Sequence, residues 1–208
     1  MLAVDGVLVV RAGARPVVSA KNRLVSTIKS VSLVYRILVF SLMLSGGLSS
    51  PAQEAAPSEY QIKSAFLYNF AKFVEWPASA FATPTSPIVV GVLGNNVFGD
   101  NLEKTLSNKV LNNRPLEYKR FESVMEATNC QILFISSSEK GKLPKIFEAL
   151  RGTSVLTVSE TPEFIEAGGM INFMLEANKI RFQINDEAAK KARLKISSKL
   201  LSLAVHPH

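Results

Sequence analysis

Apolar residues recur at intervals of three and four between Glu59 and Trp76, which predicts one long amphipathic helix. Ser58 and Gln61 have the spacing of a capping box at its start, and Pro77 is expected to end it at Trp76. Lys63 lies inside the apolar face, so its ammonium either extends past the core to solvent or is held for a ligand or partner. The apolar face comprises Ile62, Phe66, Leu67, Phe70, Phe73 and Val74.

Beyond this helix, short apolar runs alternate with short helical patterns, which predicts a single α/β domain over residues 59–205. The run at 88–93 is apolar throughout, as expected of a strand buried on both faces. Further strands are expected at 116–121, 131–136 and 155–158, with a hairpin at 170–175 and 179–184. Helices or helical turns are expected at 100–107, 123–128, 143–150, 162–167, 186–192 and after Ser197. This order predicts a mostly parallel sheet flanked by helices, with an antiparallel C-terminal hairpin.

The first 52 residues have the composition of a leader that directs secretion. A basic segment precedes a short apolar run at 37–48, and Ser50 and Ala52 supply the small residues of a cleavage site near Ala52. The run is shorter than a comfortable transmembrane helix, although an uncleaved anchor is the alternative. Residues 53–58 then form a polar linker. These features predict a periplasmic protein.

The leader also explains the charge of the chain. It carries six basic residues and one acidic residue, so its removal lowers the formal net charge from +7 to +2. A nearly neutral mature protein has no electrostatic footprint for nucleic acid. We therefore expect no nucleic-acid partner.

The residues available for catalysis are few. The only histidines, His206 and His208, lie at the end of the chain, which removes the usual general base and most zinc-site patterns. We therefore expect no enzymatic activity, no metal and no cofactor. Glu160, Glu163 and Glu166 are expected to form a solvated acidic face on a short helix. Cys130 opens an apolar run and is expected to be a buried, unreactive thiol.

Two groups of residues are candidates for binding. Phe81 and Phe98 fall in predicted loops and, with Lys63, are candidate contacts to a protein partner. In a parallel sheet, the loops after the strands at 88–93 and 131–136 would meet at the carboxyl edge. A small ligand could bind there, at Gly94, Asn95, Asn96, Ser136 and Ser137, and residues 159–161 would lie nearby.

Several segments, in this order, resemble the YfiR family of periplasmic proteins: YQIKSAFLYNFAKFVEWP, VGVLG, CQILFIS, VLTVSE, GGMINFMLEANKIRFQIN and LKISSKLLSLA. The resemblance covers roughly residues 59–204. It implies a non-enzymatic α/β regulator that binds the periplasmic domain of a membrane-bound diguanylate cyclase and holds it inactive. Release of such a brake raises cyclic-di-GMP and promotes biofilm formation. Some relatives carry paired cysteines, whereas this chain has one.

The sequence is therefore compatible with two functions. The first is a regulator that inhibits a membrane signalling enzyme, either a diguanylate cyclase or a sensor kinase, by direct contact. The second is a periplasmic small-ligand receptor subunit that works with a membrane sensor. A homodimer is compatible with either function.

Overall fold

The first helix begins where the sequence predicts and ends earlier. The computed structural model describes residues 57–205, in which helix α2 spans Glu59–Phe73. The capping box is confirmed, because Gln61 N donates to Ser58 Oγ at 3.3 Å and Ser58 N donates to Gln61 Oε1 at 2.7 Å. The predicted leader, its cleavage site and most of the predicted linker lie outside the described residues.

The predicted helix end at Trp76 is wrong, and tertiary pairing is the reason. Val74–Glu75 forms strand β1, which pairs antiparallel with β9, Lys195–Ile196. Ser197 N donates to Phe73 O at 2.9 Å beside this pair. The chain therefore leaves the helical conformation three residues before Pro77 is reached.

The main sheet has seven strands and confirms the predicted α/β class. In spatial order they are β3 (Val110–Leu111), β4 (Arg114–Phe121), β2 (Ile88–Leu93), β5 (Ile132–Ile135), β6 (Leu156–Ser159), β7 (Ile171–Glu176) and β8 (Lys179–Ile184). The central pairs are all parallel, and only β3 and β8 at the two edges are antiparallel to their neighbours. Ala177 and Asn178 make the predicted two-residue turn of the hairpin, both with positive φ.

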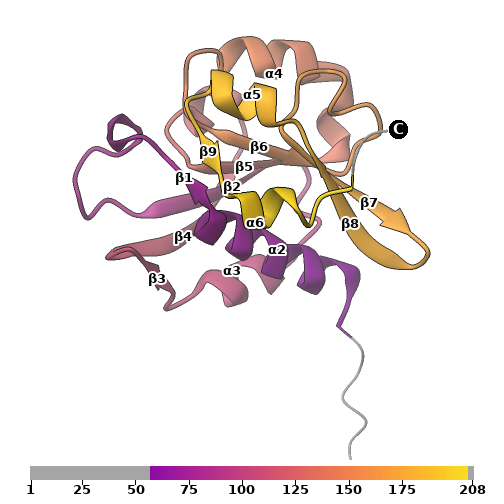
Figure 1. The fold of residues 1–208 in the computed structure, drawn as a ribbon, viewed down its shortest axis with the longest axis horizontal. Helices are drawn as coiled ribbons and strands as arrows, with labels where there is room; N and C mark the ends of the chain where they lie inside the picture. The colour runs from indigo at the N-terminus through magenta and orange to yellow at the C-terminus, as the bar shows by residue number, and fades with distance from the viewer. Residues whose placement is uncertain (1–56, 206–208) are drawn as a thin grey trace, which may run out of the picture. The chain divides into compact units, whose positions relative to one another are not determined.

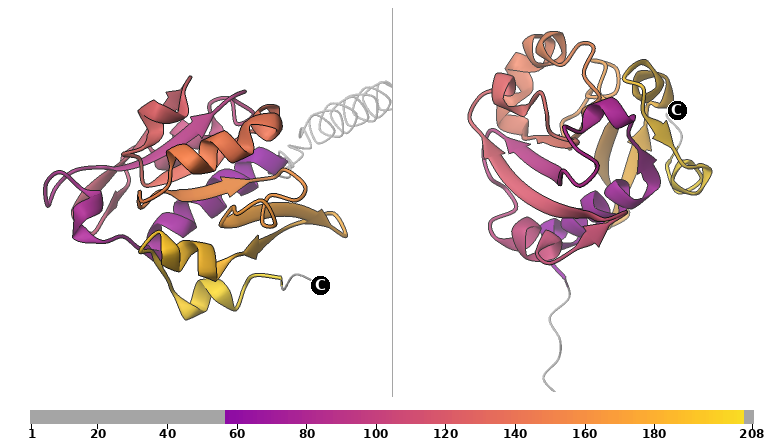
Figure 2. Two further views of the ribbon diagram at one scale, coloured as in Figure 1. Left: turned by 90° about the horizontal axis from the view of Figure 1, so that it is seen from above. Right: turned by 90° about the vertical axis from the view of Figure 1, so that its left-hand side faces the viewer.

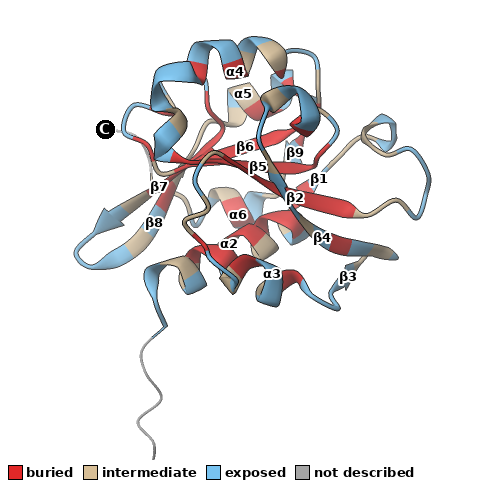
Figure 3. Cartoon of the chain, turned by 180° about the vertical axis from the view of Figure 1, so that it is seen from behind, coloured by how far each residue is buried: buried red, intermediate tan, exposed pale blue. Residues whose placement is uncertain are grey.

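Helices cover both faces of this sheet (Figures 1 and 2). They are α2, α3 (Asn101–Leu106) and α6 (Ser198–Leu201) on one side and α4 (Leu143–Ala149) on the other, and α5 (Asp186–Lys191) lies beside α4 while its buried Ala189 joins the core of the α2 side. Alternate residues of β2 supply both cores: Val90 and Val92 pack with the α2 side, whereas Val89 and Leu93 pack with the α4 side. The central strands are consequently buried along their length (Figure 3).

Two segments differ from the predicted elements. Residues 162–167 form successive turns instead of a helix, and Glu163 has a φ of 66° within them. The sequence also did not predict the two-residue strand β3, which meets β4 through Asn112 and Asn113, both with positive φ. Asparagine is among the residues that tolerate this conformation best. The sequence Asn112–Asn113 was therefore a sufficient signal for a tight turn.

Gln131 organises the amino edge of the sheet. The residue is buried, its Oε1 accepts a hydrogen bond from Val89 N at 2.8 Å, and its Nε2 donates to Ala80 O at 2.9 Å. Trp76 Nε1 donates to the Gln131 carbonyl at 3.1 Å. These bonds hold the loop between β1 and β2 against the sheet. That loop includes the 3-10 turn η1, Ala78–Ala80.

Cys130 is buried, as predicted, and burial raises the pKa of its thiol to about 12. Because the thiolate is the reactive form, we expect a thiol reagent to modify the native protein slowly at neutral pH and the urea-unfolded protein rapidly. Mass spectrometry after timed labelling measures both rates. Stoichiometric modification of the native protein at the rate of the unfolded one would contradict the core position.

Candidate functional site

The loops at the carboxyl edge of the parallel strands come together as predicted. Leu93, Ile135 and Ser159 end β2, β5 and β6 and are aligned across the ladder. The loop after β2 is bonded to the loop after β5, because Asn95 N donates to Ser138 Oγ at 3.1 Å. A Cβ atom on Gly94 would lie 2.6 Å from the same Oγ, so the two loops approach more closely than a side chain at Gly94 allows.

Hydrogen bonds within the protein occupy much of this edge. Ser136, Ser159 and Thr161 are buried, and Ser159 Oγ donates to Ile135 O at 2.7 Å. Thr161 N in turn donates to Ser159 Oγ at 3.1 Å. Ser137 and Asn95 remain exposed. A small ligand bound at Gly94, Asn95, Asn96, Ser136 and Ser137 therefore stays a prediction.

An ionic cluster lies beside this edge, under the first turns of α2. Lys63 is 3% exposed, and its ammonium forms ion pairs with Glu59 and Glu160. Glu59 precedes Lys63 by four residues and so shares its helix face, whereas Glu160 directly follows β6. The ammonium also lies 4.8 Å from the ring centroid of Tyr60. It is neutralised inside the protein and does not extend to solvent.

Tyr60 completes the cluster. Its hydroxyl donates to Glu160 Oε1 at 3.1 Å, and burial followed by the Glu160 charge raises the pKa of the phenol to about 12. The phenol consequently stays a hydrogen-bond donor at all physiological pH values. Lys63 and Tyr60 both engage Glu160, so the cluster is an ion-pair network that anchors α2 and contains no free acid–base pair.

Phe98 is a core residue, which makes its predicted exposure wrong. It is 1% exposed, and its ring makes edge-on contacts with Phe134 at 4.8 Å and with Tyr60 at 5.5 Å between centroids. Its backbone N–H is held by Asn96 Oδ1 at 3.2 Å, which turns the loop inward. A loop position in sequence therefore did not mean a surface position.

Phe81 is partly exposed, in the loop between β1 and β2. The Arg114 guanidinium lies 3.6 Å from its ring centroid and is itself fixed by hydrogen bonds to Thr83 O and Ser86 O, at 3.0 and 2.8 Å. Phe81 lines a pocket of about 390 Å³ whose wall includes Gln131. A role for Phe81 as a partner contact stays a prediction.

Glu160 is the residue that sequence reasoning misplaced most. It was grouped with Glu163 and Glu166 on a solvated helix, and the latter two are indeed exposed. The Glu160 side chain is only 14% exposed because it faces Lys63. Lys63 was the feature of the sequence that could have identified Glu160 as buried, because a cation on an apolar helix face needs a partner of opposite charge.

Two further observations concern the described part of the chain. Among residues 57–205, His, Cys, Asp and Glu side chains form no group of three that could hold a metal ion. Over the same residues, no helix combines the length and the apolar character needed to cross a membrane.

Comparisons with known proteins agree on the family and the fold. A sequence model of a family described as YfiR/HmsC-like matches residues 60–205. No curated protein matches the chain significantly. Among solved structures, the chain is similar to a conserved domain protein from Vibrio cholerae O1 biovar El Tor, with a TM-score of 0.51 and 11% identity. The alignment covers 72% of this chain and 60% of that one, and at this identity it shows the fold alone.

Proposed function

Because the chain belongs to the YfiR/HmsC-like family, we propose that it is a periplasmic regulator of cyclic-di-GMP signalling. It binds the periplasmic domain of a membrane-bound diguanylate cyclase and holds that enzyme inactive. The family match over residues 60–205 is the observation that carries the proposal. The basic leader followed by a short apolar run supports the periplasmic location.

The carboxyl edge supports action by binding without catalysis. Lys63, Glu160 and Tyr60 are engaged with one another, and Glu139 in the loop after β5 forms an ion pair with Lys142. A general acid or base must reach a substrate proton, and these groups are already occupied by their partners within the protein. In our proposal Lys63 and Phe98 maintain the shape of this edge from inside and do not contact the partner directly.

The partner surface that we propose includes Phe81. An aromatic ring that is partly exposed and already held in place by a cation loses little conformational freedom when it is covered. The adjoining pocket of about 390 Å³ provides concave surface beside the ring. A side chain of the partner can fill that pocket while Phe81 packs against it.

Inhibition requires only differential affinity. The regulator must bind the inactive conformation of the cyclase more tightly than the active one, by ~1.4 kcal/mol for each tenfold shift in that equilibrium. A signal that weakens binding to the inactive form returns the enzyme to activity.

Deleting the gene is expected to raise cellular cyclic-di-GMP, and restoring the secreted protein is expected to lower it again. A version without residues 1–52 stays in the cytoplasm and is not expected to complement. Mass spectrometry of nucleotide extracts measures the change. If cyclic-di-GMP is unchanged after deletion and no membrane protein co-purifies, the protein does not inhibit a diguanylate cyclase, and the small-ligand receptor is the favoured function.

The same strain tests the proposed surface. Phe81→Ala is expected to reduce co-purification of the membrane partner, while Leu203→Ala, which truncates an apolar residue that is 56% exposed near the C-terminus, is expected to leave it unchanged. Equal recovery of the partner with both variants would place the interface elsewhere on the protein.

A further inference from the structure

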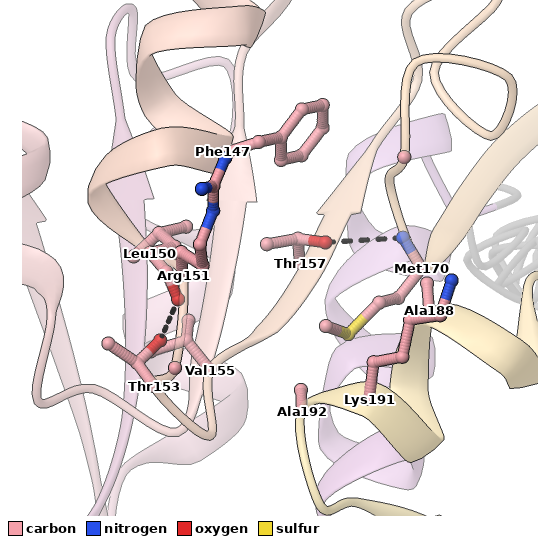
Figure 4. A pocket seen from close by; sticks show the side chains of 12 residues that line it. Phe147, Leu150, Arg151, Thr153, Val155, Thr157, Met170, Ala188, Lys191 and Ala192 are labelled. Atoms are coloured by element: carbon pink, nitrogen blue, oxygen red, sulfur yellow. Dashed lines mark hydrogen bonds between the residues drawn. The ribbon is translucent and has the colours of Figure 1, made fainter.

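A pocket between the end of α4 and α5 lies above β6, away from the carboxyl edge (Figure 4). This α4–α5 pocket has a volume of about 220 Å³. Figure 4 shows Thr157 of β6 between its two walls, with its Oγ1 accepting a hydrogen bond from Met170 N at 3.2 Å. The apolar part of the lining is formed by Phe147, Leu150, Val155, Met170, Ala188 and Ala192.

The charged residues that line the α4–α5 pocket are all basic. Arg151 and Lys191 come from its opposite walls, and both are exposed (Figure 4). Glu148, which forms an ion pair with Arg151 at 2.5 Å, does not line the pocket. An apolar floor under a basic rim is complementary to a molecule with a hydrocarbon body and a negative charge.

A second pocket of about 190 Å³ adjoins the first, because Gly152 and Thr153 line both. We call it the Arg193 pocket. It also contains Ser154, which is 8% exposed and whose Oγ has no hydrogen-bond partner. That oxygen is closed off from the pocket, so the hydrogen-bond donors that a ligand can reach here are those of Arg193.

Arg193 is held in an unusual conformation at the mouth of this pocket. Its φ is 63°, at the position after α5 where two hydrogen bonds, Arg193 N to Lys190 O and Leu194 N to Ala189 O, close the helix. Glycine is the usual residue there, since a side chain is strained at this φ. The guanidinium donates to Gly152 O at 2.8 Å, which leaves further N–H groups for an anion.

We infer that the two pockets together form a binding site for an amphipathic carboxylate. The carboxylate accepts hydrogen bonds from the N–H groups of Arg193 that do not face Gly152 O. The alkyl or aryl body lies in the α4–α5 pocket against Leu150, Val155 and Met170. The inference does not depend on the proposed function, because binding is measured on the purified protein alone.

Isothermal titration with sodium octanoate tests the site. Octanoate is expected to bind with one-to-one stoichiometry and at least tenfold more tightly than acetate, which lacks the chain, or 1-octanol, which lacks the charge. Equal affinity for acetate would reduce the site to one for small anions, and equal affinity for 1-octanol would remove the role of Arg193. Either result, or no binding of octanoate, overturns the inference.

Two variants locate the site independently. Arg193→Gly removes the guanidinium while it fits the left-handed backbone, so octanoate affinity is expected to fall at least tenfold without loss of folding. Ala188→Leu fills the apolar pocket and is expected to have a similar effect on affinity. Lys179→Ala removes an equal charge at the β7–β8 turn and is expected to have none. Octanoate binding that survives both pocket variants would place it elsewhere.

A vesicle-binding experiment distinguishes a soluble ligand from a lipid surface as the partner of this site. Vesicles of phosphatidylglycerol are expected not to retain the protein in a flotation assay. Retention that Arg193→Gly abolishes, together with no octanoate binding, would assign this face to the membrane and overturn the inference.

Discussion

Replacing Phe70 with alanine is expected to lower the free energy of unfolding by ~3–5 kcal/mol. Phe70 lies on the buried face of α2 and is completely inaccessible to solvent. Its ring centroid lies 5.7 Å from that of Phe173 and 5.3 Å from that of Phe182, so it joins the first helix to the β7–β8 hairpin. Truncation leaves a cavity that the surrounding aromatic rings cannot close, because strands and helix hold them on all sides. Urea unfolding followed by circular dichroism measures the loss.

Lys72→Ala is the matched control on the same helix. Lys72 is exposed, and alanine is at least as good a helix former, so its unfolding midpoint is expected to stay near that of the wild type. The slope of the unfolding free energy against urea should be the same for all three proteins if the transition remains two-state. A Phe70→Ala midpoint close to that of Lys72→Ala would mean that the ring is not packed in the core.

Glu160→Ala is expected to be the second most destabilising change, at ~3 kcal/mol. It leaves the Lys63 ammonium, on a side chain only 4% exposed, with Glu59 as its remaining counter-ion. The Glu59 side chain is 47% exposed and therefore compensates the buried charge incompletely. Loss of Glu160 should also lower the pKa of Tyr60, because Glu160 is the main cause of its elevation after burial. Thermal and urea unfolding measure the first effect, and spectrophotometric titration of the phenols measures the second.

Glu166→Ala removes the same charge from an exposed position of the same segment and is expected to change stability little. Lys63→Met combined with Glu160→Ala should recover much of the lost stability, because no unpaired charge is then buried. If Glu160→Ala alone unfolds like the wild type, Lys63 reaches water in solution and the cluster is not an anchor.

Local signals in the sequence predicted most of the regular structure. The Ser58 capping box and the turn at Ala177–Asn178 depend on neighbouring residues only, and both are confirmed. Strand β2 was predicted with its observed bounds, since a run that is apolar on both faces is typical of the centre of a parallel sheet. These elements were sufficient for the α/β class and the mostly parallel order.

The errors lie where distant residues decide local structure. Two-residue strands such as β1 and β9 exist only because each finds the other, so neither has a pattern of its own. The Lys63–Glu160 pair joins positions 97 residues apart, and Phe98 is covered by Tyr60 of α2. For the binding candidates, the sequence correctly predicted that the two loops meet at the carboxyl edge. It could not predict how completely side chains fill that edge.

The β1–β9 pair also sets the order in which the domain can be completed. Lys195 follows its partner Glu75 by 120 residues, so the contact that closes the end of the first helix comes from a segment that is synthesised much later. Closing so long a loop is slow compared with local pairing. While a chain emerges N-terminus first, α2 therefore lacks both this strand partner and its hairpin partners, Phe173 and Phe182. Such connectivity delays native packing of α2 until the distant segment is available, and an unfolded chain is the form that the proposed export requires.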